Sequence, residues 1–97
     1  MKIIHESENC KVYLWGGLSG DDEGDPVTCD PFLAVEVQAE GMFTKAILEG
    51  TCGGEWETIH SFPFPGIASV TSKAWKFRPR IEGSDKDMAN IYLVVRR

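Results

Sequence analysis

The chain has 97 residues, the length of one domain with one hydrophobic core. Its formal net charge of −5 argues against a nucleic-acid binder, because such a protein presents a basic face to the phosphates. The hydrophobic content of 42% is typical of a globular protein, and 10 glycines with 5 prolines favour many short strands and turns. The three cysteines are odd in number and far apart, so they cannot form a complete set of intrachain disulfides, and we expect reduced thiols: Cys10, Cys29 and Cys52.

Residues 1–10 are polar after Ile3 and Ile4. We interpret them as a flexible N-terminal arm, followed by a single β-sandwich domain over residues 11–97. No apolar run has the length of a signal-peptide core or approaches the ~20 residues that span a bilayer. We therefore expect a protein that is made in the cytoplasm and has no membrane partner.

The segment Lys11–Trp15 alternates in the way that is typical of a strand. Val12 and Leu14 belong to one face, and Tyr13 and Trp15 belong to the other. Since both faces are apolar, one of them is available to a partner protein.

Residues 16–26 form a glycine-punctuated loop that is rich in carboxylates. Carboxylates at alternate positions could supply oxygen ligands to calcium, but the spacing does not match the EF-hand loop and no glutamate closes it. We favour a solvated acidic loop over a calcium site. The acidic residues concerned are Asp21, Asp22, Glu23 and Asp25.

Two strands are expected next, a brief one over Pro26–Cys29 and a longer one over Phe32–Glu40. The longer strand has the cleanest alternation in the chain, and one of its faces is wholly apolar. We expect this face to point into the core, and its members are Leu33, Val35, Val37 and Ala39.

The segment Thr44–Ile59 reads as a β-hairpin around which the rest of the chain is organised. Two β-like runs flank the glycine-rich turn Gly50–Gly54, which matches a hairpin with a loop of three to five residues. Trp56 follows the turn, and we expect it to anchor the hairpin to the core because so large a ring is costly to expose.

The last third of the chain contains two prolines in His60–Gly66, which favour a connection or an edge strand. A short strand follows over Ile67–Ser72. In Ala74–Gly83 an apolar face alternates with a charged one, and Pro79 predicts edge placement or a bulge. Ala89–Val95 is expected to close the sheet.

No window of a dozen residues has helical spacing without an internal glycine or proline. Turn signals recur every 8–12 residues or so, as in antiparallel sandwiches. The sequence thus predicts an all-β fold, a small antiparallel β-sandwich or jelly-roll-like barrel of about seven or eight short strands.

The sequence contains no nucleophile elbow, phosphate-binding loop or zinc-protease motif, and its two histidines stand far apart. We therefore expect no enzymatic activity, no cofactor and no metal site. The side chains offered for partner binding are Tyr13, Trp15, Trp75, Arg78 and Arg80. Surface tryptophans leave open an alternative, a carbohydrate-binding or adhesion-type module, although core packing is the commoner fate of tryptophan.

Three segments carry a resemblance to a family. They are an opening strand Val12–Gly17, the run Ile47–Thr51 followed by Trp56, and the run Phe77–Gly83 before a final strand that ends in Arg96 and Arg97. Over roughly Lys11 to Arg97 the chain resembles the small all-β structural proteins of tailed bacteriophages. It departs from the family in the hairpin turn, where Cys52 and Gly53 replace acidic residues, and in a longer acidic loop.

This resemblance implies a non-enzymatic phage or prophage virion protein, such as a head decoration, cement or head–tail protein. Its partners would be phage capsid or tail proteins, and its place would be the virion after synthesis in the host bacterial cytoplasm. Binding to a repeating surface would draw on many symmetric copies. We expect self-association, with a trimer as the hypothesis, and no nucleic-acid partner.

Overall fold

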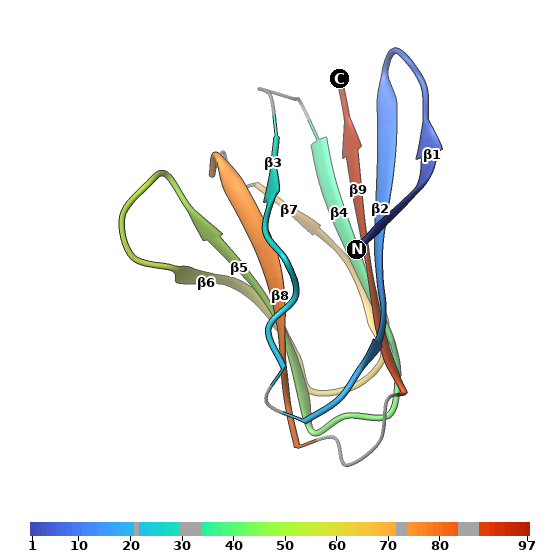
Figure 1. The fold of residues 1–97 in the computed structure, drawn as a ribbon, viewed down its shortest axis with the longest axis vertical. Helices are drawn as coiled ribbons and strands as arrows, with labels where there is room; N and C mark the ends of the chain where they lie inside the picture. The colour runs from blue at the N-terminus through green and yellow to red at the C-terminus, as the bar shows by residue number, and fades with distance from the viewer. Residues whose placement is uncertain (21, 30–33, 72–73, 84–87) are drawn as a thin grey trace.

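The computed structural model describes residues 1–20, 22–29, 34–71, 74–83 and 88–97, and all of its regular elements are strands (Figure 1). The predicted all-β class is confirmed, with nine strands in the described residues. They are β1 (Lys2–Glu6), β2 (Cys10–Leu18), β3 (Val27–Thr28), β4 (Ala34–Gly41), β5 (Lys45–Thr51), β6 (Glu57–Phe62), β7 (Gly66–Val70), β8 (Lys76–Glu82) and β9 (Ala89–Arg96).

The strands form two antiparallel sheets, one with the order β1-β2-β9-β4-β7 and the other with the order β3-β8-β5-β6. Four pairs are nested within one another along the chain, namely β2 with β9, β3 with β8, β4 with β7 and β5 with β6. This is one long hairpin whose tip is the β5–β6 turn. Strands β9 and β4 pair with each other, as do β8 and β5, which rolls the hairpin into a jelly roll.

The core lies between the two sheets and is filled by alternate residues of the inner strands. On β4 the predicted inward face is confirmed, since Val35, Val37 and Ala39 are each 2% exposed or less, while Leu33 lies outside the described residues. Strand β8 supplies Phe77 and Ile81, both 0% exposed. Period-two patterning therefore identifies the core faces of the central strands.

Residues 1–10, predicted to be a flexible arm, contain the edge strand β1. Lys2 pairs with Leu14 and Glu6 with Lys11, with an irregularity between Ile3 and His5. All five residues of β1 are exposed. The N-terminal segment thus adds a fifth strand to the sheet without contributing to the core.

The hairpin predicted around Gly50–Gly54 is confirmed as β5 and β6. Thr51 organises the turn, because its hydroxyl donates to the Gly54 carbonyl at 3.0 Å and accepts from the Gly53 amide at 3.0 Å. Every residue of β5 after Lys45 is buried, on both faces of the strand. The buried residues of β5 therefore include a charged one, Glu49.

Strand β8 is not an edge strand, which corrects the placement inferred from Pro79. It lies between β3 and β5, and Pro79 pairs with Leu48 of β5. The Pro79 carbonyl accepts from the Gly24 amide at 2.9 Å, so its nitrogen also faces away from β5. The missing N–H therefore costs the β5–β8 ladder nothing.

Candidate interaction surface

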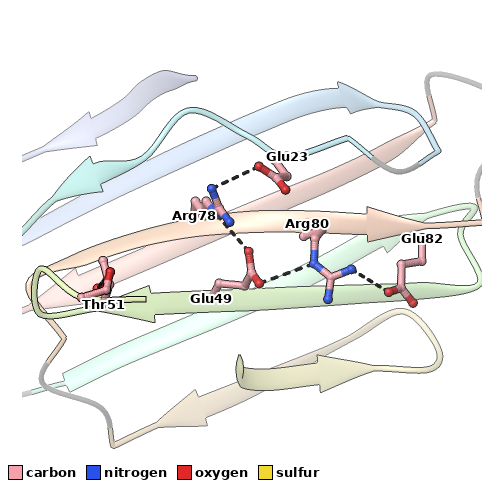
Figure 2. A network of polar contacts seen from close by, with 7 residues as sticks. Glu23, Glu49, Thr51, Arg78, Arg80 and Glu82 are labelled. Atoms are coloured by element: carbon pink, nitrogen blue, oxygen red, sulfur yellow. Dashed lines mark hydrogen bonds and ion pairs between the residues drawn. The ribbon is translucent and has the colours of Figure 1, made fainter. Parts of the chain in front are cut away.

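The outer face of the four-stranded sheet is built around a buried carboxylate, that of Glu49, which is 7% exposed. Glu49 on β5 lies opposite Arg78 on β8, so the two side chains share a face. Arg78 Nε donates to Glu49 Oε1 at 2.9 Å, and Arg80 Nε lies 3.4 Å from Oε2. Figure 2 shows both arginines directed at this one carboxylate.

The contacts extend from Glu49 to both ends of the face. Arg78 Nη1 lies 3.1 Å from Glu23 Oε2, which comes from the β2–β3 loop. Arg80 Nη1 donates to Glu82 Oε1 at 2.6 Å, and this hydrogen bond raises the pKa of Arg80 above its ordinary value. Three carboxylates therefore face two guanidinium groups. Arg78 and Arg80, predicted to bind a partner, are engaged within the chain.

Trp56 belongs to this face as well, which corrects its predicted position in the core. It is half-buried and is not part of the core cluster. The Arg78 guanidinium carbon lies 4.3 Å from the centre of its ring, a cation–π contact. Trp56 thus contacts an arginine on the outer face of the sheet and does not fill the interior.

Two of the aromatic residues predicted to meet a partner are buried. Tyr13 is 6% exposed and Trp15 is 2% exposed, and both pack in the core. Trp15 Nε1 donates to the Asp25 carbonyl at 2.8 Å, and Gly24 lets the loop approach so closely, since a Cβ there would lie 2.6 Å from the Trp15 ring. The face of β2 that points outward carries Val12 and Leu14.

Trp75 is the predicted aromatic residue that the structure leaves on the surface. It is 52% exposed, just before β8, and Lys76 Nζ lies 5.1 Å from its ring centre. Its backbone is fixed, since its amide donates to Thr51 at 2.9 Å and its carbonyl accepts from Cys29 at 3.0 Å. Of the five residues predicted to contact a partner, Tyr13 and Trp15 are therefore in the core, and Trp75 is exposed. Arg78 and Arg80 pair with Glu49.

Two carboxylates of the acidic loop, Asp22 and Glu23, make contacts within the chain. The Asp22 carboxylate accepts from the Ser19 amide and hydroxyl, both at 2.9 Å, and these bonds hold the pKa of Asp22 below its ordinary value. Glu23 pairs with Arg78, and Asp21 lies outside the described residues. Over the part of the loop that the structure describes, these side chains form no cluster of three metal ligands.

A surface that sequence reasoning missed lies at one end of the sandwich. We call it the apolar end, and it consists of Met42, Phe64, Ile67 and Met88, which are 60%, 75%, 67% and 45% exposed. The Met42 amide donates to the Met88 carbonyl at 3.4 Å, and Gly41 pairs with Ala89. The β4–β5 and β6–β7 turns and the start of β9 lie together at the lower end of the view in Figure 1.

The sequence carries a weak signal for the apolar end. Met42 follows a glycine and Phe64 stands between two prolines, so each is a large apolar residue in a turn where no core face is expected. The strand order places the segments that carry them next to one another, because β4 lies between β9 and β7. Four exposed large apolar side chains at one end of a small domain are typical of an interaction surface.

Comparisons with known proteins found no matching family model, no similar curated protein and no similar solved structure. In the described ranges, the structure has no helix of the length and apolar character required to cross a membrane.

Proposed function

We propose that this chain is a non-enzymatic virion structural protein of a tailed phage or prophage. It binds the capsid or head–tail surface as a symmetric oligomer, and the trimer remains the hypothesis for its assembly. The observation that carries the proposal is the apolar end, where Met42, Phe64, Ile67 and Met88 are each 45% exposed or more. Burying them against a protein surface would stabilise the complex by about 25 cal/mol for each Å² of apolar area removed from water.

The jelly-roll topology supports the same proposal by analogy. Double-sheet jelly rolls of eight strands occur in viral capsid proteins and also in lectin domains. One fold can serve many functions, so the topology favours a viral structural protein but does not identify its partner. The turns at the apolar end belong to different arms of the folded hairpin.

The test is co-sedimentation with phage heads assembled from the capsid protein encoded nearest to this chain. The full chain should pellet with the heads, and the double variant Phe64→Gln/Ile67→Gln should lose about tenfold in affinity, which matches the transfer of two large side chains at a partly buried contact. The matched control is Ile3→Gln/Ile4→Gln, whose residues are 47% and 45% exposed on β1. Equal loss in both variants, or no binding by the unaltered chain, would contradict the proposal.

Sedimentation velocity of the same three proteins tests the oligomer separately. An associating chain should show a concentration-dependent sedimentation coefficient at micromolar concentration. A monomer throughout that range would contradict self-association but would leave the head-binding experiment to decide the rest.

One observation favours a second function, a carbohydrate-binding module. Trp75 offers an exposed ring, and Trp56 is half-buried beside Arg78. A sugar stacking on Trp75 would quench its fluorescence, and Trp75→Phe would remove that response while leaving the signal of buried Trp15. No quenching by a panel of glycans would reject this alternative.

A further inference from the structure

Strand β7 is an edge of the larger sheet that lacks the features by which edge strands are usually protected. Such features are bulges, charged side chains and short length. The other edge strands of the described fold each have at least one of them: β1 and β6 have an irregular register and carry charged residues, and β3 has two residues. Strand β7 pairs with β4 without any irregularity, and none of its five residues is charged. Its outer edge is therefore open to an added strand.

The backbone of β7 is hydrogen-bonded on one side. In an antiparallel ladder, alternate residues direct their N–H and C=O groups toward the neighbouring strand, and the other residues direct theirs away from it. The neighbour of β7 is β4, and within the described residues Gly66–Val70 make no backbone hydrogen bond outside the ladder with β4. An extended segment that lies along β7 would pair with the outward groups, as in β-strand addition.

A groove runs beside this edge, where β7 faces β6 of the opposite sheet. Its volume is about 300 Å³, at the lower end of the range of roughly 300–1,000 Å³ for sites that hold a ligand. Half-buried Ile59 and Val70 pack against the core and form the apolar part of its lining. The rest of the lining is polar and consists of Thr58, His60, Ser69 and Thr71. The groove is therefore suited to small apolar side chains that project from an added strand.

The groove has a negative charge at one end. Glu57 precedes Thr58 and shares the inner side of β6 with His60, because their partners on β5 are two residues apart. Glu57 is exposed, and the ion pairs of the described residues do not include it. A basic segment complements this charge, whereas a second copy of the chain brings a net charge of −5.

We propose that β7 binds an extended basic segment of another protein by strand addition. The backbone of the segment pairs with β7, its small apolar side chains contact Ile59 and Val70, and a lysine or arginine pairs with Glu57. The inference does not rest on the proposed virion function, because the lining of the groove contains no residue of the apolar end. The test uses free peptides and no phage heads, so the two proposals can fail separately.

The test is a titration of the ¹⁵N-labelled full chain with the peptide Ac-Lys-Thr-Val-Thr-Val-Thr-Lys-NH₂. Its lysines and valines share one face when the peptide is extended. Amide shifts centred on β6 and β7 should saturate at peptide concentrations of about 1 mM. Those amides of β7 that exchange quickly in the free chain should become protected from exchange, because strand addition pairs the backbone. The matched peptide with glutamate in place of both lysines should bind about tenfold more weakly.

A further peptide and two variants make the test specific to backbone pairing and to Glu57. A peptide with proline in place of the central threonine keeps both charges but loses a backbone donor, and it should not bind measurably. Glu57→Gln should weaken binding of the lysine peptide about threefold, as expected for an exposed ion pair. Glu8→Gln, at an exposed position before β2, is the matched charge control and should leave binding unchanged.

Four results would overturn the proposal. They are shifts that do not saturate, binding without protection of β7 amides, equal binding of the lysine and glutamate peptides, and equal binding by Glu57→Gln and the unaltered chain. Amides of β7 that become protected without peptide as the protein concentration rises would show that a second copy occupies the edge. That outcome would also contradict a basic partner segment.

Discussion

Arg78 covers Trp56 on the outer face of the four-stranded sheet, with its guanidinium carbon 4.3 Å from the centre of the ring. The same guanidinium donates to Glu49 at 2.9 Å and lies 3.1 Å from Glu23. One side chain of β8 thereby joins the β2–β3 loop, strand β5 and the end of the β5–β6 turn. The outer face of this sheet is therefore held by charge and stacking, while the inner face is held by apolar packing.

Replacement of Glu49 by glutamine should destabilise the chain by about 2–3 kcal/mol. The change keeps the size of the side chain but leaves Arg78 and Arg80 beside each other without their shared carboxylate, and loss of one partner from a largely buried pair is costly. Urea unfolding monitored by tryptophan fluorescence measures the effect. Glu57→Gln, at an exposed position on β6, is the control and should stay within about 0.5 kcal/mol. A similar small loss in Glu49→Gln would mean that the network adds little to stability.

The two tryptophans should differ in their cost of truncation. Trp56→Ala should cost about 1–2 kcal/mol, because it removes a cation–π contact and a half-buried ring. Trp15→Ala should cost about 3–5 kcal/mol, because Trp15 is buried in the core and leaves a cavity. Both are measured by denaturant unfolding. Equal costs would place Trp56 in the interior after all.

Alanine substitution at Gly41 and at Gly53 distinguishes the energetic cost of a positive φ from the cost of a steric clash. Gly41 has φ of 100°, and an added Cβ would lie 1.7 Å from the Met88 carbonyl oxygen. Gly53 has φ of 115°, but an added Cβ there would meet nothing within 4 Å. Gly53→Ala should cost about 1–2 kcal/mol from conformation alone, and Gly41→Ala should cost more than about 3 kcal/mol. Thermal unfolding of the two variants compares them directly, and a Gly41→Ala protein as stable as Gly53→Ala would contradict the close contact with Met88.

The carboxylate of Asp22 should make stability depend on pH at the acid end. The Ser19 amide and hydroxyl hold its folded-state pKa below the ordinary value. A lowered folded-state pKa stabilises the fold above the unfolded pKa of about 4, and this contribution is lost as the pH falls through the folded-state pKa. Asp22→Asn should therefore lower the urea midpoint at pH 7, and the difference from the unaltered chain should vanish at strongly acid pH.

A carboxyl titration by NMR checks the cause of this shift. Ser19→Ala removes the hydroxyl donor but keeps the amide, so the pKa of Asp22 should rise part of the way to its ordinary value. An Asp22 that titrates at the ordinary value in the unaltered chain would exclude the Ser19 contacts as a source of stability.

Period-two alternation predicts the central strands and most of the core, as Val35, Val37 and Ala39 illustrate, but it does not predict β1 (Lys2–Glu6). It could not decide which face of Lys11–Trp15 points inward, because both faces are apolar. The choice depends on β9, which pairs with β2 and aligns Tyr13 with buried Leu93. Patterning therefore predicts that a strand has two faces, and the topology determines which one is buried.

The pairing of Glu49 with Arg78 and Arg80 could not be predicted from the sequence for a related reason. The charged face of β8 was visible, but its partner Glu49 lies on β5, and their pairing joins positions about 30 residues apart. Trp56 was misplaced because a large ring was assumed to require an apolar core, whereas a guanidinium plane can cover it as well. The apolar end was missed because its members come from three separate segments.

The nesting of strand pairs also constrains how the chain can fold. Only β5 and β6 are neighbours in both sequence and space within the nested hairpin, and each outer pair must close a longer loop, which slows folding. Strand β9 lies between β2 and β4, so the larger sheet stays split until the last strand has been synthesised. A nascent chain that stalls before β9 therefore presents two unpaired strand edges to its neighbours, and the risk of aggregation is concentrated in that interval.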